Sequence, residues 1–193
     1  MIEYISGQVI ELNPAHTVID INGMGYFIHI SVNTYSLLNG KKQAMLYVHE
    51  VIREDAHVLY GFHDLDEREL FRNLISVSGV GANTGILFLS SLPASEIKVA
   101  IVSGDVNRLK SVKGVGLKTA QRIIVELKDK LSKEPISSNI FSEPDNSTRD
   151  EALSALDTLG FVKKGAEKVV DKIMKSNPDF SVEQVIKEAL KQM

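Results

Sequence analysis

The sequence predicts an α+β protein of several domains: a five-stranded, OB-like β-barrel, a tandem helix-hairpin-helix domain and a three-helix module. Three observations predict this order. Residues 1–63 hold short segments rich in Val, Ile and Tyr, and residues 64–132 hold one Gly-apolar-Gly pattern twice. Residues 133–147 contain two prolines and four serines without an apolar period, which is typical of a flexible linker, and residues 148–193 return to a helical period.

The N-terminal segment is expected to form strands and no helix. The strands are expected at 4–12, 17–22, 26–32, 44–53 and 57–62, separated by turn signals such as Asn22-Gly23. Five strands this short, with no helix-length period, suit a small closed barrel such as the OB-fold.

An acidic pair lies between the last two expected strands. Glu54 and Asp55 are adjacent at a predicted hairpin tip. Such a pair acts at a metal or as acid and base only when further carboxylates converge on the same point, and none is visible here. From this segment alone, a polar turn is the simpler interpretation.

The repeat in the middle of the chain predicts two phosphate-binding hairpins. Residues 74–84 and 109–119 are identical at seven of eleven positions. Glycine permits a tight turn and a close approach of backbone to ligand, and the next helix begins at once with free N–H groups. Asp64 or Asp66 is expected to cap the first helix of this domain, and Asp105 the helix before the second hairpin. The predicted DNA-binding residues are Gly79, Gly81, Asn83 and Thr84 in the first copy and Gly114, Gly116, Lys118, Thr119 and Arg122 in the second.

Charge supports nucleic acid as the ligand of these hairpins. The net charges of residues 1–63, 64–134 and 135–193 are −3, +2 and −2, and eight basic residues lie between Arg108 and Lys133. The second hairpin is therefore expected to bind more strongly than the first. The simpler alternative is that both hairpins are only turns between packed helices, but a tandem pair also matches the two backbones of a duplex.

The last segment predicts a small docking module, or else a stabilising appendage. Thr148 with Glu151 and Ser181 with Gln184 have the spacing of capping boxes. The stretch from Leu156 through Leu159 to Phe161 resembles the first-helix turn of ubiquitin-associated (UBA-like) three-helix modules.

Composition excludes several classes of protein. The chain has no cysteine, so disulfides and thiolate metal sites are excluded, and its five histidines lack metal-ligand spacing. No cofactor or metal is expected. Lys118-Thr119 lacks the preceding glycine of a nucleotide-binding P-loop, so ATP must be used by another chain. Without a signal-like start or a membrane-length apolar run, the protein is expected in the cytoplasm, with no membrane partner.

The ordered set of motifs resembles the RuvA family, the Holliday-junction-binding subunits of the bacterial branch-migration machinery. The matching stretches are Val9-Ile10, Arg53-Glu54-Asp55-Ala56 with Leu59-Tyr60-Gly61-Phe62, Gly79-Val80-Gly81, and Gly114-Val115-Gly116 with Lys118 to Lys128. The resemblance covers essentially the whole chain.

The resemblance implies a non-enzymatic protein that binds four-way junction DNA as a homotetramer, or as an octamer of two tetramers. It implies that Glu54 and Asp55 form an acidic pin at the junction centre. It also implies that Leu156, Leu159 and Phe161 lie in the domain that binds the hexameric RuvB-type ATPase, and some of the three must form the core of that domain. A RuvC-type resolvase is implied as a further partner.

The chain departs from the family pattern at two positions. Family members often have a lysine in place of Asn83 and a second basic residue in place of Leu117. This difference implies that DNA binding relies more on backbone amides in this chain. Two functions of other classes also fit the hairpins: a nuclease that uses them for targeting, and a protein-interaction adaptor in which they are only turns.

Overall fold

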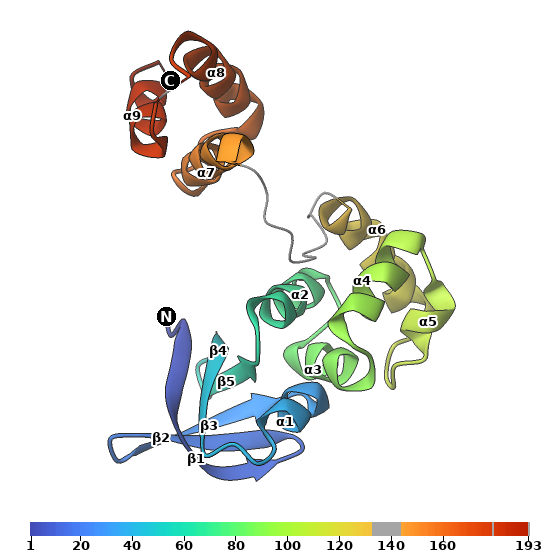
Figure 1. Ribbon diagram of the computed structural model, residues 1–193. Coiled ribbons are helices and arrows are strands. Elements are labelled where there is room, and N and C mark those ends of the chain that lie inside the picture. The colour runs from blue at the N-terminus through green and yellow to red at the C-terminus, as the bar shows by residue number, and fades with distance from the viewer. Residues whose placement is uncertain (133–143, 179, 193) are drawn as a thin grey trace. The chain divides into compact units, whose positions relative to one another are not determined.

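The computed structural model describes residues 1–132, 144–178 and 180–192. The chain divides into two compact units, Met1–Pro135 and Ile136–Met193. The first holds the strands and six of the helices described below, and the second holds three helices (Figure 1).

The first unit begins with a closed β-barrel, as the sequence predicts. Its strand order is β1-β2-β3-β5-β4, with β3 and β5 parallel and the other pairs antiparallel. Alternate residues of each strand point inward, because successive side chains of a strand face opposite sides. Leu46 and Val48 of β4, for example, are buried in the barrel core with Ile28 and Ile30 of β3. The strands are β1 (Tyr4–Asn13), β2 (His16–Ile21), β3 (Met24–Ile30), β4 (Gln43–Ile52) and β5 (His57–Phe62).

One helix of the barrel was not predicted. Helix α1 (Val32–Leu38) connects β3 to β4, so the expected strand at 26–32 ends early, at Ile30. Ser31 caps the helix, because its hydroxyl accepts a hydrogen bond from the Thr34 N–H at 3.0 Å. Seven residues are too few to show a helical period, and a helix this short depends on tertiary contacts for its stability.

The barrel is followed by a five-helix domain whose caps agree with the sequence. Asp64 accepts from the Glu67 N–H at 2.7 Å at the start of α2, and Asp105 accepts from the Arg108 N–H at 3.0 Å at the start of α5. The helices share one apolar core that includes Phe71 and Phe88. They are α2 (Leu65–Ser76), α3 (Ala82–Ser91), α4 (Ala94–Ser103), α5 (Val106–Lys110) and α6 (Leu117–Leu131).

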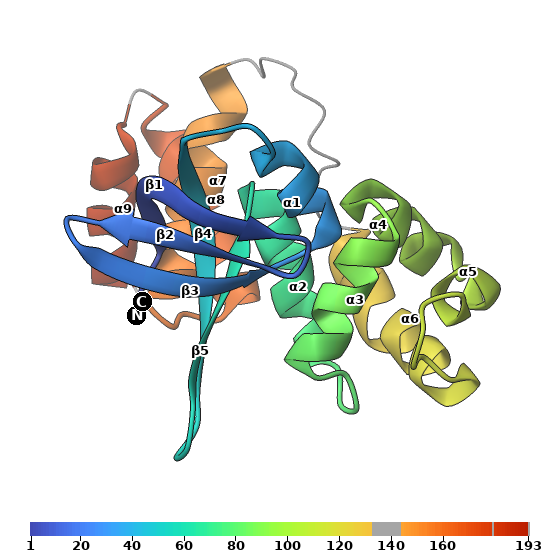
Figure 2. The same cartoon turned by 90° about the horizontal axis from the view of Figure 1, so that it is seen from below.

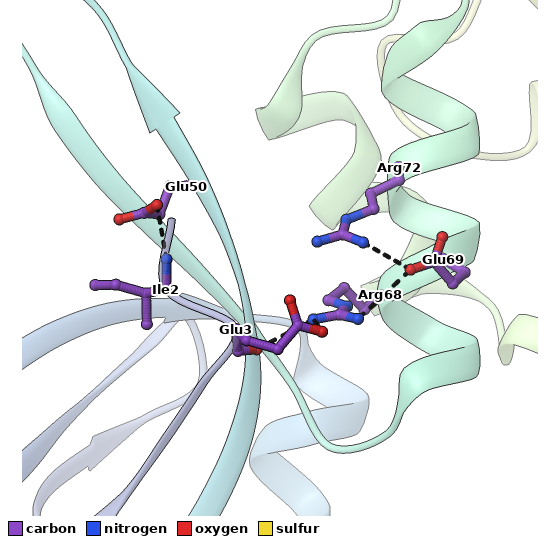
Figure 3. A network of polar contacts seen from close by, with 6 residues as sticks. All are labelled: Ile2, Glu3, Glu50, Arg68, Glu69 and Arg72. Carbon is purple, nitrogen blue, oxygen red and sulfur yellow. Dashed lines mark hydrogen bonds and ion pairs between the residues drawn. The ribbon is translucent and has the colours of Figure 1, made fainter. Parts of the chain in front are cut away.

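Charged contacts attach helix α2 to the start of the barrel (Figure 3). Arg68 is buried, and its guanidinium donates to the Glu3 backbone carbonyl at 3.1 Å and pairs with the Glu3 carboxylate at 2.6 Å. The same guanidinium lies over the ring of Tyr47, 5.5 Å from its centroid. On the exposed side of α2, Arg72 pairs with Glu69 at 2.8 Å.

A second attachment centres on the buried carboxylate of Glu67 in α2. Its oxygens accept from the hydroxyls of Ser31 at 2.5 Å and Thr34 at 2.7 Å, both of which belong to the start of α1. The Asn33 amide of α1 donates to the Leu89 carbonyl of α3 at 2.5 Å. Helix α1 is therefore the joint between the barrel and the helical domain.

The second unit is a three-helix module with its own core. It contains α7 (Pro144–Thr158), α8 (Lys163–Ser176) and α9 (Val182–Gln192). The capping box at Ser181 is confirmed, since the Ser181 N–H donates to Gln184 at 2.9 Å and the Gln184 N–H to the Ser181 hydroxyl at 3.4 Å.

The capping box at Thr148 is wrong. Helix α7 begins at Pro144, so Thr148 lies inside the helix and Pro144 takes the early position that proline favours. The expected linker 133–147 therefore overlaps the helix at its end, and its first part, 133–143, lies outside the described residues.

In the described part of the chain, no single helix is long and apolar enough to cross a membrane. Helices α3 and α4 together reach the length and composition of a span, but they meet at a bend of 103°. Their large apolar residues, such as Phe88 and Ile101, are buried in the core of the first unit.

Candidate nucleic-acid interface

The two predicted hairpins have nearly the same backbone conformation. Gly79 and Gly114 have φ angles of +91° and +86°, in the region that side-chained residues rarely adopt. In the first hairpin the Val80 N–H donates to Val77 at 3.0 Å, and in the second the Val115 N–H donates to Val112 at 3.1 Å. Both central valines are buried, as the pattern predicts. The sequence repeat therefore encodes a structural repeat.

Each hairpin ends at the exposed start of a helix. Gly81 is the N-cap of α3 and Gly116 the N-cap of α6, with φ and ψ of −86° and 170° and of −82° and 171°. Neither cap makes a side-chain hydrogen bond, and a Cβ added at either glycine would meet nothing within 4 Å. Uncapped N–H groups and the positive end of the helix dipole favour an anion at both positions.

The residues that follow the two caps differ in charge. Asn83 is exposed, and its side-chain oxygen accepts from the Tyr60 hydroxyl of β5 at 3.4 Å. Lys118 occupies the equivalent position in the second copy and is exposed. Thr84 and Thr119 are half-buried in the first turns of their helices. The contact from Tyr60, which orients Asn83, had no signal in the sequence.

Arg122 connects the two copies. It projects from α6, where its Nε donates to Glu126 at 2.9 Å, and its Nη1 donates to the Ser78 carbonyl of the first hairpin at 3.4 Å. The sequence placed Arg122 beside the second hairpin only. The structure shows that it also reaches the first.

Much of the basic run remains available to an anion. Arg108 pairs with Glu96 and Arg122 with Glu126. Within the described residues, no ion pair engages the lysines at 110, 113, 118, 128 and 130. The lysines at 110, 113 and 118 therefore give the second hairpin positive charge without ion-pair partners among the described residues, whereas those at 128 and 130 lie in the last turn of α6.

The acidic pair lies at the tip of the β4–β5 hairpin. Arg53 and Ala56 close the turn, with N–H to carbonyl distances of 2.8 and 3.4 Å, and leave Glu54 and Asp55 exposed between them. Figure 2 shows this hairpin extending well beyond the other strands, and α3 and α6 begin on the side toward which its tip points. In this view, the starts of α3 and α6 and the acidic tip therefore lie toward the same side of the first unit.

The base of that hairpin is anchored in the helical core. Val51 of β4 and Val58 of β5 pack against it, and the ring of Tyr60 lies 5.3 Å from that of Phe71. Burial raises the pKa of Tyr60, so its hydroxyl keeps its proton and remains a donor to Asn83.

Two histidines on the outside of the barrel have shifted pKa values. Burial lowers the pKa of His29, with a smaller contribution from His16. Burial also lowers the pKa of His49, and the charges of Arg72 and Arg68 lower it further. No three His, Asp or Glu side chains among the described residues come close enough together to hold a metal ion.

The three predicted partner-binding residues of the second unit differ in exposure. Leu156 is fully buried, so it is one of the three that form the module's core. Phe161 packs against that core and is half-buried, whereas Leu159 is 58% exposed. Val162, which was not predicted, is 79% exposed beside them. The turn between α7 and α8 therefore exposes apolar side chains to solvent.

Comparisons with known proteins agree with this architecture. Family models match the RuvA N-terminal domain over residues 1–61, a SAM-like helix-hairpin-helix tandem over 71–129 and the RuvA C-terminal domain over 147–193. A protein of Christiangramia forsetii named Holliday junction branch migration complex subunit RuvA is 49% identical over 193 residues, the full length of both chains. The chain belongs to the RuvA family. RuvA proteins of the same full name from Flavobacterium psychrophilum and Bacteroides fragilis are 48% and 49% identical, again over the full length of both chains.

Membership of the RuvA family confirms the predicted order of barrel, tandem helix-hairpin-helix domain and C-terminal helical domain. Which residues of this chain contact DNA or a partner protein stays a prediction.

Proposed function

We propose that this chain binds four-way DNA junctions and recruits a RuvB-type ATPase, which drives branch migration in recombination and repair. It is the DNA-binding subunit of the complex and has no catalytic role, because the ATPase is a separate chain. The observation that carries the proposal is the pair of equivalent hairpins, whose uncapped helix starts lie on the same side as the acidic tip (Figure 2).

The hairpins hold DNA without reading its sequence. Backbone N–H groups at Gly81 and Gly116 lie at two helix starts, and phosphates are the ligands such ends prefer. Because two similar sites occur in one unit, both backbones of a single duplex arm are engaged. The uncompensated lysines around the second hairpin add a salt-dependent attraction.

Selectivity for a junction comes from assembly. In a homotetramer, each subunit holds one arm with its two hairpins, and four tips bring eight carboxylates from Glu54 and Asp55 to the centre. These charges repel phosphates that cross the centre and favour an open junction. A second tetramer on the opposite face gives an octamer.

The second unit recruits the motor. Leu159, Val162 and the partly exposed Phe161 supply an apolar surface, and apolar residues form the centre of most protein interfaces. A RuvC-type resolvase is a further partner that acts on the held junction. A complex that works on chromosomal junctions of a bacterium meets them in the cytoplasm, which is the location we propose.

One experiment tests the proposal. Binding of the protein to a labelled four-way junction and to a duplex of the same arm sequence is measured over a range of salt, together with solution mass. We expect strong preference for the junction, weaker binding at higher salt and a mass of four or eight subunits. Equal affinity for the two DNAs would contradict the proposal, cleavage of the junction with magnesium would indicate a nuclease, and failure to bind DNA at low salt would indicate an adaptor.

A further inference from the structure

Helix α8 of the second unit carries four exposed lysines on one face. Its buried residues are Ala166, Val170 and Ile173. At about 100° per residue, four lysines fall within about 80° of one another on the opposite side of the helix, and they extend over about 16 Å of its length. All four are exposed, and we name them the α8 lysine face: Lys164, Lys168, Lys172 and Lys175.

Acidic residues compensate the α8 lysine face only in part, since the charge of Lys175 acts on Asp171 at its edge without forming an ion pair. No ion pair within 4 Å engages any of its four lysines in the described part of the second unit. Asp171, the acidic residue nearest to this face along the helix, is bound by Arg149 at 2.7 Å, and this ion pair lowers the pKa of Asp171. Like charges one turn apart destabilise a helix, so an unpaired row of lysines is unfavourable unless it meets an anion.

Helix α9 shows what an ordinary solvated face of this module looks like. It carries Glu183, Lys187, Glu188 and Lys191 in mixed order, and Lys191 pairs with Glu188 at 2.9 Å. Mixed signs are typical of faces that only keep a protein in solution. Helix α8 also carries Glu167 and Asp171, but the α8 lysine face itself holds lysines alone, and this segregation of charge points to a binding role.

We propose that the α8 lysine face binds the phosphate backbone of duplex DNA in the arms that flank the junction. The inference rests on the proposed function, because it requires the first unit to hold the junction. Lysines one turn apart are about 6 Å apart along the helix, which presents a row of point charges to a regularly charged backbone.

Two observations favour DNA over an acidic protein. The α8 lysine face contains no apolar residue, whereas a specific protein interface is built around an apolar centre. The exposed apolar residues Leu159 and Val162 lie outside this face, at the turn before α8. The module is also part of the chain that holds the junction, so flanking duplex is present at a raised effective concentration.

The test uses the full chain and two junctions with the same centre, one with arms only long enough for the hairpins and one with longer arms. The variant replaces all four lysines, by Lys164→Gln, Lys168→Gln, Lys172→Gln and Lys175→Gln. For the long-armed junction, we expect affinity to fall at least about tenfold at low salt, and the slope of log affinity against log salt to become shallower by up to about 3.6 for each second unit that contacts an arm. Affinity for the short-armed junction should not change.

A matched control tests whether the effect depends on where the lysines lie or only on the amount of charge removed. The double variant Lys168→Gln with Lys172→Gln is compared with Lys187→Gln with Lys191→Gln, which removes the same charge from α9. Only the α8 pair should weaken long-armed binding, and thermal melting should show both variants folded. Unchanged binding, or an equal loss on both junctions, would overturn the inference.

Loss confined to the stimulation of a RuvB-type ATPase would also overturn it, and would assign the face to a protein partner. The wild-type protein on the short-armed junction reports on the proposed function alone. The proposed function fails if the wild-type protein shows no preference for this junction over duplex. Only the α8 inference fails if the wild-type protein shows that preference and the four-lysine variant binds the long-armed junction as tightly as the wild type does.

Discussion

Gly114 and Gly116 lie two residues apart in the second hairpin, but their backbone conformations give them different roles. Gly114 has a φ of +86°, which costs a side-chained residue about 1–2 kcal/mol. Gly116 has a φ of −82°, which any residue adopts, and open space where a Cβ would stand. Its conformation therefore does not require glycine, and we expect that glycine is needed there for a phosphate to approach the α6 N–H groups.

These conformations predict opposite results for two single substitutions. Gly114→Ala should lower the free energy of unfolding by about 1–2 kcal/mol. Gly116→Ala should change it by less than about 0.5 kcal/mol but weaken junction binding about tenfold, because the methyl group occupies the phosphate's approach. Denaturant unfolding and junction titration of both variants check this. If the Gly116→Ala protein bound the junction normally, the backbone N–H groups at the start of α6 would not be part of the interface.

The histidines predict how stability depends on pH. Burial lowers the folded-state pKa of both His29 and His49 below the ordinary value of 6.5, so as pH falls through 6.5 the unfolded chain takes up protons first. Stability should therefore decrease between pH 7.5 and pH 5.5. Melting temperatures across this range check it, with the double variant His29→Gln and His49→Gln as control. The control should show a flatter profile, and an unchanged profile would mean that other groups dominate.

At the scale of structural elements, the two hairpins have nearly the same backbone conformation but differ in the side chains around them. Lys118 and Arg122 follow the second, whereas Asn83 and Thr84 follow the first. Hydrogen bonds from a charged donor contribute about 1.5–3 kcal/mol and neutral ones about 0.5–1.5. Arg122 also contacts the Ser78 carbonyl, so its removal affects both copies.

Replacing the charged pair should therefore weaken junction binding more than replacing the neutral pair. Lys118→Ala with Arg122→Ala is compared with Asn83→Ala with Thr84→Ala in the same titration. Circular dichroism of both variants controls for folding. If the neutral pair proved more important, the first hairpin would be the stronger site.

Sequence patterns predicted the elements whose signals are local. A strand of alternating residues, a Gly-apolar-Gly hairpin and the caps at Asp64 and Asp105 each depend on residues close in sequence, and these predictions are confirmed. Helix α1 and the burial of Leu156 could not be read locally. The first depends on partners more than thirty residues away, and the second on which side of a helix meets the other two.

One of the attachments between the barrel and the helices depends on the buried carboxylate of Glu67. Glu67→Ala would leave the hydroxyls of Ser31 and Thr34 without their acceptor, which should lower the free energy of unfolding by about 2–3 kcal/mol. Glu69→Ala, two residues further along α2 and on its exposed side, is the control and should cost less than about 1 kcal/mol. Urea unfolding checks both. Equal small losses would show that the apolar core alone holds the joint.

At the scale of the whole molecule, we expect the acidic tip to act only in the homotetramer that we propose. One tip presents two carboxylates to solvent, where charges are screened over about 8 Å at physiological salt. In the proposed tetramer, four tips would concentrate eight charges within the space of a DNA crossover, so their repulsion of phosphates would become substantial. The rigid base at Val51 and Val58 holds each tip in place.

Replacing Glu54 and Asp55 by Asn keeps the turn polar and removes these charges. Junction binding should then strengthen or stay level while selectivity over duplex falls, because a neutral centre no longer repels a continuous duplex that lies across it. Affinities for junction and duplex, with and without magnesium, are measured for both proteins. A catalytic pair would instead lose a magnesium-dependent activity with little change in binding. Unaltered selectivity together with unaltered activity would leave Glu54 and Asp55 with the role of a polar turn, and junction selectivity would then have to arise from the arrangement of the hairpins.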